Sequence, residues 1–242
     1  MKNKINSAIL ALPLVVASTA LAQAEERRTY ELNGFEMVEA HNGIDVAIQQ
    51  GDTFSIVAKS NKASHLDDLK ITQNGDRLII KQDTDMNVFS LLSLADNWNR
   101  SVHVTIQMPA LSEVKSKSGA DVRVDGFQSG MITFSASSGA DLIAKDIDAG
   151  KIHLEASGGA NLTAEGTCAT LNAEASSGAD IWASSLECSK AHIEASSGAD
   201  IDAKVTDHLT AEASSGGTVN VDGTPNYTNI EERSGGDVVI AR

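Results

Sequence analysis

A four-residue phrase close to Ser-Gly-Ala-Asp occurs seven times from residue 118 onward in this 242-residue chain. Its central glycines follow one another at steps of 20, 20, 19, 20, 18 and 19 residues, at Gly119, Gly139, Gly159, Gly178, Gly198, Gly216 and Gly235. A period near 20 residues indicates one structural unit stacked on copies of itself. The repeat therefore predicts a solenoid. It also argues against an enzyme, because most of the repeat region forms a regular surface.

Apolar and polar residues alternate on both sides of each glycine. The third residue after it is always apolar and branched: Val122, Leu142, Leu162, Ile181, Ile201, Val219 and Val238. The third residue before it is serine in the first copy, alanine in the next five and glutamate in the last: Ser116, Ala136, Ala156, Ala175, Ala195, Ala213 and Glu232. A period of two is the pattern of strands with one buried face. Glycine suits the sharp corner between two such strands.

These patterns predict an all-β fold, a single-stranded parallel β-helix with coils of about 20 residues. Each strand would pair with the same strand one coil away, roughly 4.8 Å along the axis. The inward alanines would keep the interior narrow. An array of amphipathic helices is the alternative. However, the repeats show no 3.6-residue period, and they place β-branched residues where strands favour them.

The first 24 residues have the parts of a secretory signal peptide. Lys2 and Lys4 are basic, and residues 9–17 form a short apolar core. Two overlapping cleavage sites of small residues follow, Ala20-Leu21-Ala22 and Ala22-Gln23-Ala24. An uncleaved membrane anchor is the alternative, but a spanning helix needs roughly 20 apolar residues. We therefore expect residues 1–24 to be removed and the mature chain to be exported, without a transmembrane segment.

The chain is acidic. Its formal net charge is −14, and loss of Lys2 and Lys4 with the signal peptide would make it −16. Nucleic acids and anionic lipid surfaces select basic patches, so neither is expected as a partner. Aromatic residues make up only 4% of the chain, so platforms on which bases or sugars could stack are scarce.

Two regions follow the signal peptide. Residues 29–109 predict a β region that continues into the helix through coils that are wider or contain hairpins, and residues 110–242 are the regular repeats. In the first region Asn42-Gly43 predicts a hairpin-type turn, and residues 70–80 predict a strand, a turn and a second strand. Residues 86–100 do not alternate, which predicts a loop or a short helix.

The two cysteines provide an independent check on the coil. Cys168 lies ten residues before Gly178, and Cys188 lies ten residues before Gly198. They hold the same place in neighbouring coils, so their Cα atoms should lie about one strand spacing apart, within the range for a disulfide. An exported chain meets an oxidising compartment, and we expect the bond to form. Two unlinked thiols are the alternative.

Acidic residues recur at two outward positions of the repeat. Two residues after each glycine stand Asp121, Asp141, Asn161, Asp180, Asp200, Thr218 and Asp237, and four residues before it stand Glu155, Glu174, Glu194, Glu212 and Glu231. Like charges at strand spacing repel one another. Water and salt relieve this repulsion if the carboxylates fan outward. Alternatively, Ca²⁺ could bridge neighbouring aspartates, with Asp141, Asp180 and Asp200 as candidate ligands.

A local structural role for the aspartates is the interpretation that the sequence favours. Asp and Asn accept hydrogen bonds from nearby backbone amides in tight turns, and Ser does so more weakly. The repeated phrase would then satisfy the backbone groups of the corner. On this interpretation it carries no chemistry.

Residue constellations typical of enzymes are missing from the sequence. The six histidines have no metal-ligand spacing, and no serine lies in a nucleophile elbow. Polysaccharide-cleaving β-helices use paired acids, so that class is kept as an alternative. Those enzymes generally need long loops to wall a cleft, whereas these coils have short, equal turns. We expect no enzyme, no catalytic residue and no cofactor.

The whole pattern resembles the auto-transporter adhesin, head GIN domain family of exported bacterial proteins. The residues that carry the resemblance are Phe35-x-x-Val38, Asn42-Gly43-Ile44-Asp45-Val46-x-Ile48, Gln50-Gly51-Asp52 and the Gly-Ala-Asp corners from Gly119 onward. It extends from about residue 30 to residue 242. The resemblance implies a right-handed parallel β-helix and an envelope or surface location. It implies no catalytic or ligand residue.

The sequence favours a non-enzymatic, exported β-helix that acts as an adhesin or envelope-interaction module. Its polar ladder faces would bind a polysaccharide or a protein of the envelope or cell surface. The expected location is the periplasm, or the surface and outer membrane, of a Gram-negative-type bacterium. A periplasmic structural or sensory protein is the first alternative, and a carbohydrate-active β-helix enzyme is the second. The end of the last coil also raises the possibility of an end-to-end homo-oligomer.

Overall fold

The computed structural model describes residues 25–82 and 102–241. The predicted signal peptide and the predicted loop or helix at 86–100 lie outside these residues. Within them the chain is almost entirely β-sheet, with one short helix, α1 (Ala63–Asp67). The strands of this part of the chain are β1 (Glu26–Tyr30), β2 (Met37–His41), β3 (Asp45–Gln50), β4 (Ser55–Ser60), β5 (Leu69–Asn74), β6 (Arg77–Gln82), β7 (Val102–Met108), β8 (Glu113–Lys117), β9 (Asp121–Asp125), β10 (Gln128–Ser137), β11 (Asp141–Ser157), β12 (Asn161–Ser176), β13 (Asp180–Ser196), β14 (Asp200–Ser214), β15 (Thr218–Asp222), β16 (Tyr227–Arg233) and β17 (Asp237–Ala241).

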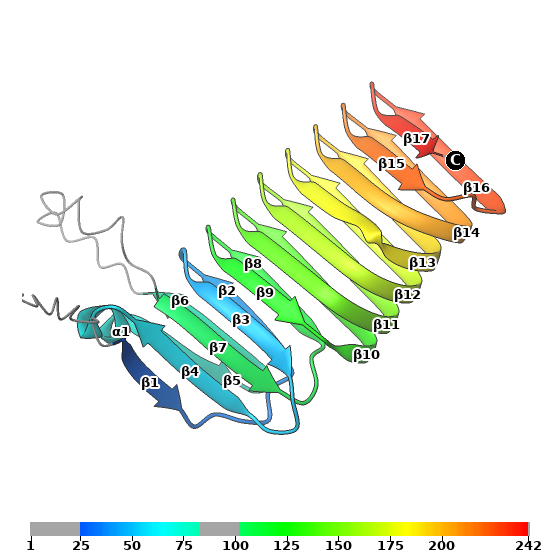
Figure 1. The fold of residues 1–242 in the computed structure, drawn as a ribbon. Helices are drawn as coiled ribbons and strands as arrows, with labels where there is room; N and C mark the ends of the chain where they lie inside the picture. The colour runs from blue at the N-terminus through cyan, green and yellow to red at the C-terminus, as the bar shows by residue number, and fades with distance from the viewer. Residues whose placement is uncertain (1–24, 83–101, 242) are drawn as a thin grey trace, which may run out of the picture.

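The repeats form a stack of parallel coils along one axis (Figure 1). The long strands β11, β12, β13 and β14 each pair in parallel with the next. Their pairing keeps equivalent residues in register, so Leu142 pairs with Leu162, Leu162 with Ile181, and Ile181 with Ile201. The prediction of a parallel β-helix with coils of about 20 residues is confirmed.

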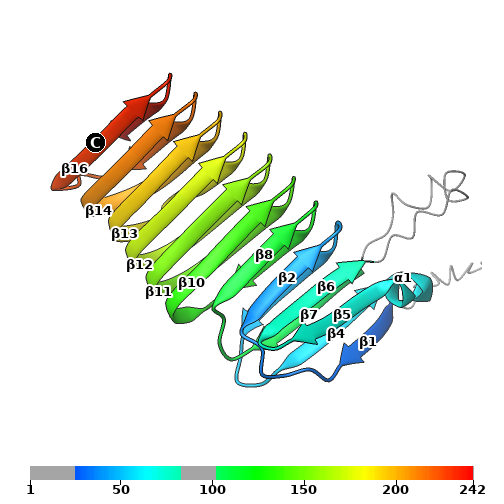
Figure 2. The same ribbon diagram turned by 180° about the vertical axis from the view of Figure 1, so that it is seen from behind.

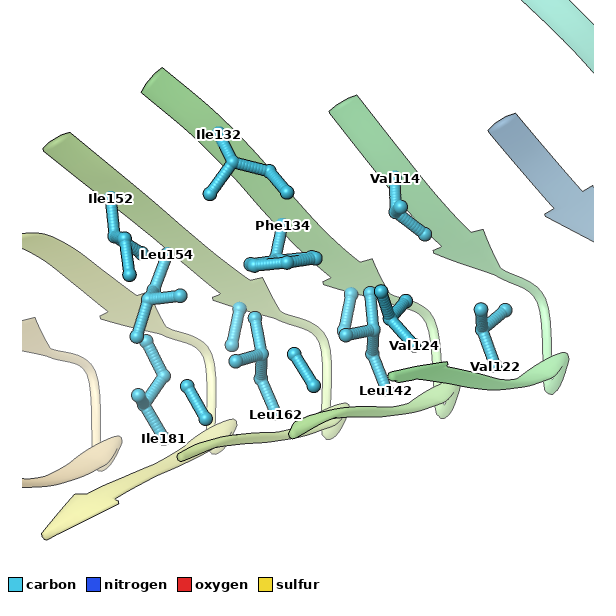
Figure 3. Close-up of a cluster of buried hydrophobic side chains, with 14 of the residues drawn as sticks. Val114, Val122, Val124, Ile132, Phe134, Leu142, Ile152, Leu154, Leu162 and Ile181 are labelled. Carbon is cyan, nitrogen blue, oxygen red and sulfur yellow. The ribbon is translucent and has the colours of Figure 1, made fainter. Parts of the chain in front are cut away.

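Each coil encloses an apolar interior. Along β11 buried and exposed residues alternate, except that Lys145-Asp146 and Gly150-Lys151 are exposed pairs, so the strand turns a corner at each. Figure 3 shows Ile132 and Phe134 on one side of the interior and Leu142 on the other, with their side chains directed inward. The predicted inward alanines are buried at Ala136, Ala156, Ala175, Ala195 and Ala213. Small side chains therefore let the two sides approach closely.

The third corner of each coil is the Ser-Gly pair of the repeat. Ser177 (φ 57°) and Gly178 (φ 66°) both adopt the left-handed backbone conformation, which the sequence predicted only for the glycine. The amide of Gly178 donates a hydrogen bond of 3.1 Å to the carbonyl of Ser197 in the next coil. Backbone bonds between coils thus hold the corner, a role that the sequence analysis assigned to aspartate side chains.

The N-terminal strands enter the stack out of chain order. β2 pairs in parallel with both β6 and β8, and β3 pairs in parallel with both β7 and β9. The first coil of the chain therefore lies inside the stack, and Figure 2 shows β2 between β6 and β8. Asn42-Gly43 is the corner of this coil, and the amide of Gly43 donates to the carbonyl of Ser118 (3.2 Å). The predicted hairpin there is wrong, because its two strands pair with other coils.

The two ends of the stack differ. At the N-terminal end β5 and β6 form an antiparallel hairpin, β4 pairs antiparallel with β7, and β1 pairs antiparallel with β4. The strand, turn and strand predicted at residues 70–80 are confirmed, as are hairpin-containing coils. At the C-terminal end β16 pairs with β14 and β17 with β15, and every residue of β16 is exposed.

A disulfide joins two neighbouring coils. Cys168 of β12 and Cys188 of β13 pair directly in the sheet, with their Cα atoms 4.6 Å apart. Both side chains are buried, so the bond lies on the inward side of the coil. The predicted disulfide is confirmed, because equal positions in adjacent coils are necessarily one strand spacing apart.

Candidate functional site

Two columns of outward side chains cross the sheet face that follows each Ser-Gly corner. The first, called the aspartate column, contains residues that pair from coil to coil: Asp45, Asp121, Asp141, Asn161, Asp180, Asp200, Thr218 and Asp237. The second, called the mixed column, lies two residues further along each strand: Ala47, Arg123, Ile143, Thr163, Trp182, Asp202, Asn220 and Val239. The structure thus brings the predicted aspartates together on one face.

The acids of the aspartate column repel one another. Partial burial raises the pKa of Asp121, and the charges of Asp45 and Asp141 raise it further. Burial also raises the pKa of Asp180, with the charges of Asp200 and Asp202 acting in the same direction. In the folded state these carboxylates are therefore held close together without full neutralisation. A ligand that donates hydrogen bonds to these carboxylates would reduce the repulsion between them.

The candidate calcium ligands are not evenly spaced along this column. Asp180 and Asp200 are direct neighbours, but Asn161 separates Asp141 from Asp180. The amide of Asn161 donates a hydrogen bond of 2.7 Å to Asp141. Among the residues that the structure describes, no group of three or more His, Cys, Asp or Glu side chains is placed to hold a metal ion. The calcium site remains a prediction.

A hollow of about 310 Å³ lies on the same face, across strands β9, β11, β12 and β13. We call it the Trp182 hollow. It is lined by Asp121, Val122, Arg123, Asp141, Leu142, Ile143, Asn161, Thr163 and Trp182. Arg123 and Trp182 belong to the outermost of the four strands, with the shorter Ile143 and Thr163 between them in the mixed column. The side chain of Trp182 is 44% exposed.

The sequence analysis missed this site because it counted aromatic residues and did not place them. A signal was nevertheless present. Trp182 stands four residues after Gly178, a position that the alternation assigns to the outer face. At this position the indole presents an apolar ring and one N–H donor to the solvent. One tryptophan in an outward column of mostly small or polar residues is therefore a candidate binding position.

The glutamates form a column on another face of the coil. Glu155, Glu174, Glu194, Glu212 and Glu231 pair in that order. Ser135 donates a hydrogen bond to Glu155 (3.1 Å) at the start of this column, and Arg233 forms an ion pair with Glu231 at its end. A cavity of about 80 Å³ lies beside Glu194, Glu212 and Arg233. It is far smaller than the Trp182 hollow, which is therefore the stronger candidate site.

The sequence profile of a family described as "Putative auto-transporter adhesin, head GIN domain" matches residues 34–225. The match includes all four strands that carry the Trp182 hollow. This chain belongs to that family. The resemblance stated from the sequence is confirmed, although the family match ends before β16 and does not reach residue 242. No curated protein is detectably similar to the chain.

Solved structures share the fold of this head GIN domain protein at low sequence identity. A crystal structure of a "putative adhesin" from Bacteroides fragilis matches with a TM-score of 0.77 and 14% identity, covering 91% of this chain and 98% of its own. A crystal structure of a "Putative lipid binding protein" from Parabacteroides distasonis matches with a TM-score of 0.69 and 14% identity, covering 90% of this chain and 97% of its own. A crystal structure of a "putative adhesin" from Parabacteroides merdae matches with a TM-score of 0.66 and 14% identity, covering 90% of this chain and 96% of its own. At this identity the likeness establishes the fold alone.

No helix within residues 25–82 and 102–241 has the length and apolar character needed to cross a membrane.

Proposed function

We propose that this head GIN domain protein is an exported, non-enzymatic adhesin or envelope-interaction module. It binds a polymer or protein of the cell envelope through the outward columns that follow the Ser-Gly corners. The observation that carries the proposal is the unbroken register of these columns. Aspartate-column positions pair from β3 through β9, β11, β12, β13, β14 and β15 to β17. Such a face offers the same polar groups to each successive unit of a polymer.

Binding by repeated weak contacts requires accessible groups that are not used within the protein. Asp180 and Asp200 meet this condition, since they neighbour each other in the column and carry like charge. Removal of residues 1–24 as a signal peptide would place the folded chain outside the cytoplasm, where the disulfide between Cys168 and Cys188 is stable.

Protease treatment of intact cells tests the location. Loss of the protein, while a periplasmic control survives, would support a surface adhesin. Survival until the outer membrane is breached would exclude direct adhesion and favour a structural or sensory role within the envelope.

Co-sedimentation of the purified mature chain with isolated envelope polymer tests the binding itself. We expect the protein to pellet with the polymer and to be released by excess soluble polymer. Failure to pellet with any envelope fraction would contradict the proposal. Sedimentation velocity of the same sample tests the proposed end-to-end homo-oligomer.

A further inference from the structure

We infer that the Trp182 hollow is a binding site for uncharged hexose-based glycans, with the indole of Trp182 as its stacking platform. The inference rests on the proposed function and deepens it, because it names one site and one ligand class within the polymer-binding face.

The hollow presents two groups that are open to a ligand, Arg123 and Trp182, although the charge of Arg123 also acts on Asp121 and opposes the rise of its pKa. Among the described residues, neither the guanidinium of Arg123 nor the indole N–H of Trp182 takes part in a hydrogen bond or an ion pair. Both side chains are exposed. Arg123 offers several donors and no acceptor, and Trp182 offers one donor beside an apolar ring. Both groups are therefore available to a ligand.

The floor and rim of the hollow differ in chemistry. Ile143 and Thr163 present a methyl-bearing floor between Arg123 and Trp182. Asp121, Asp141 and Asn161 line the side nearest the Ser-Gly corners. Carboxylates accept hydrogen bonds and do not donate them, whereas Arg123 only donates. A matching ligand must carry an apolar surface together with groups that both donate and accept.

A pyranose ring meets both requirements. Its C–H face is apolar and stacks on an aromatic ring, and each hydroxyl can donate to a carboxylate while it accepts from a guanidinium. The distance from β9 to β13 spans three strand spacings, roughly 14 Å, so the hollow has room for a short run of sugar rings. A cavity of about 310 Å³ is at the lower end of the range for small-molecule sites.

The charges disfavour two other classes of ligand. Asp121 and Asp141 outnumber Arg123, so an anionic headgroup or phosphate would meet net repulsion. A cationic peptide would pair with the aspartates and could stack on Trp182, but Arg123 would repel it at the other end. An uncharged polyhydroxylated ligand satisfies all of these groups at once.

The disulfide supports the geometry of the site. Thr163 stands on β12 and Trp182 on β13, the two strands that Cys168 and Cys188 join. The bond fixes these two coils relative to each other. The floor and the stacking platform are thereby held in one arrangement before a ligand arrives, which reduces the entropy cost of binding.

Tryptophan fluorescence gives a direct test, because the chain contains only two tryptophans. In the mature chain with Trp98→Phe, Trp182 is the sole indole. We would titrate this protein with cellohexaose, maltohexaose, mannohexaose and chitohexaose, and measure the emission and its quenching by acrylamide. At least one hexasaccharide should saturably change the emission and protect Trp182 from quenching. No change with any of the four would overturn the inference.

Matched variants, made in the full mature chain and assayed by calorimetry, separate the hollow from the rest of the face. Trp182→Ala should weaken binding of the active hexasaccharide at least tenfold, and Trp182→Phe should retain part of the affinity. Thr163→Arg should abolish binding by filling the floor. Tyr227→Ala, which removes another exposed aromatic ring far along the stack, should leave binding unchanged. Equal effects of Trp182→Ala and Tyr227→Ala would contradict a specific site.

Other ligand classes are tested by the same calorimetric titration. Tighter binding of hexalysine than of every hexasaccharide, or tighter binding of phosphatidylglycerol vesicles, would overturn the glycan assignment. If Trp182→Ala still co-sediments fully with envelope polymer, the proposed function stands and the hollow is not its site. If neither protein sediments but hexasaccharide binding is normal, the hollow stands and the envelope function fails.

Discussion

The N-terminal coils and the repeat coils differ in how they arrange their outward charges. On β2, β6 and β8 the signs are mixed. Glu39 pairs with Lys117 (2.9 Å) and with Arg77 (3.4 Å), and Glu113 pairs with Lys115 (2.8 Å) and Arg77. In the repeats, acids of one sign stand in register, as Asp180 and Asp200 do.

The pKa shifts of the acids follow this difference. Burial works to raise the pKa of Glu39, but hydrogen bonds from Lys117 and His41 outweigh it, and the pKa lies below its ordinary value. Burial likewise opposes a lowered pKa at Glu113, where Lys115 and Arg77 prevail. Asp121 and Asp180 shift upward instead. The N-terminal cations therefore favour the charged forms of Glu39 and Glu113, whereas burial and neighbouring acids disfavour the charged forms of Asp121 and Asp180.

The interiors of the two regions differ in the size of their side chains. Large side chains such as Phe35, Ile48 and Met108 are fully buried in the N-terminal coils, whereas alanines line much of the repeat interior. The N-terminal region therefore has a smaller share of alanine among its buried apolar residues. It also closes its end of the stack with antiparallel strands, which protects the sheet edge.

The largest expected effect is the loss of a large N-terminal core residue. Phe35 is fully buried and packs on Phe54, with ring centroids 4.9 Å apart. Phe35→Ala should lower the free energy of unfolding by about 3–5 kcal/mol, because it leaves a cavity in a packed interior. Urea unfolding followed by circular dichroism measures the change. Met131→Ala, at a 59% exposed side chain, is the control and should cost less than about 1 kcal/mol.

The disulfide is the chief reinforcement that the repeat adds to its small interior. Its cysteines are 20 residues apart in sequence. Replacing both with alanine should lower the free energy of unfolding by about 3 kcal/mol, since the unfolded chain loses a cross-link. Alanine should fit because Ala149 holds the equivalent buried place in the preceding coil. Unchanged unfolding of the double variant would show that the coil stack alone holds this register.

The N-terminal ion pairs should make a smaller, pH-dependent contribution. Because the folded-state pKa of Glu39 is lowered, its stabilising effect is present above the unfolded-state pKa and is lost as pH falls through the folded-state pKa. Glu39→Gln should cost about 0.5–1.5 kcal/mol at pH 7 and much less at acid pH. Melting temperatures of both proteins from pH 7 to pH 3 provide the comparison. A cost that stayed constant across this range would point to packing rather than charge.

Features set at fixed offsets within one coil could be predicted from the sequence. The period of the glycines, the inward Leu142 and Ile181, and the Cys168–Cys188 bond all follow from counting along the chain. The place of β2 inside the stack could not be predicted. By pattern alone Val38 could pair with many apolar residues, and its two partners, Leu78 and Val114, are distant in sequence.

Apart from the outward position of Trp182, the candidate site could not be predicted from the sequence pattern either, for a different reason. The aspartate column is visible because its residues are alike. The Trp182 hollow depends on unlike residues in the mixed column, and Arg123, Ile143, Thr163 and Trp182 become neighbours only through the register of four strands. A repeat identifies what recurs, whereas a binding site within it is formed by what does not recur.

The smallest expected effect tests whether the repeat acids are indeed left unneutralised. Asp180 has a raised folded-state pKa, so the folded protein binds its proton more tightly than the unfolded chain does. Its carboxylate therefore costs stability at neutral pH, and this cost disappears as pH falls through the folded-state pKa. At pH 7, Asp180→Asn should leave the melting temperature unchanged or raise it, and the gain in the free energy of unfolding should not exceed about 1 kcal/mol. The difference in melting temperature between the variant and the wild-type protein should vanish at acid pH.

Calcium provides the decisive control for this last comparison. If Ca²⁺ bridges Asp180 and Asp200, millimolar calcium should raise the melting temperature of the wild-type protein, and the double substitution of both residues by Asn should abolish that rise. If the two carboxylates only repel each other, calcium should act equally on both proteins. The first result would mean that the repeat neutralises its aspartates with a bound cation. The two regions would then differ only in whether Ca²⁺ or a basic side chain supplies the positive charge. The second would leave the column open to hydrogen-bond donors, as the glycan site requires.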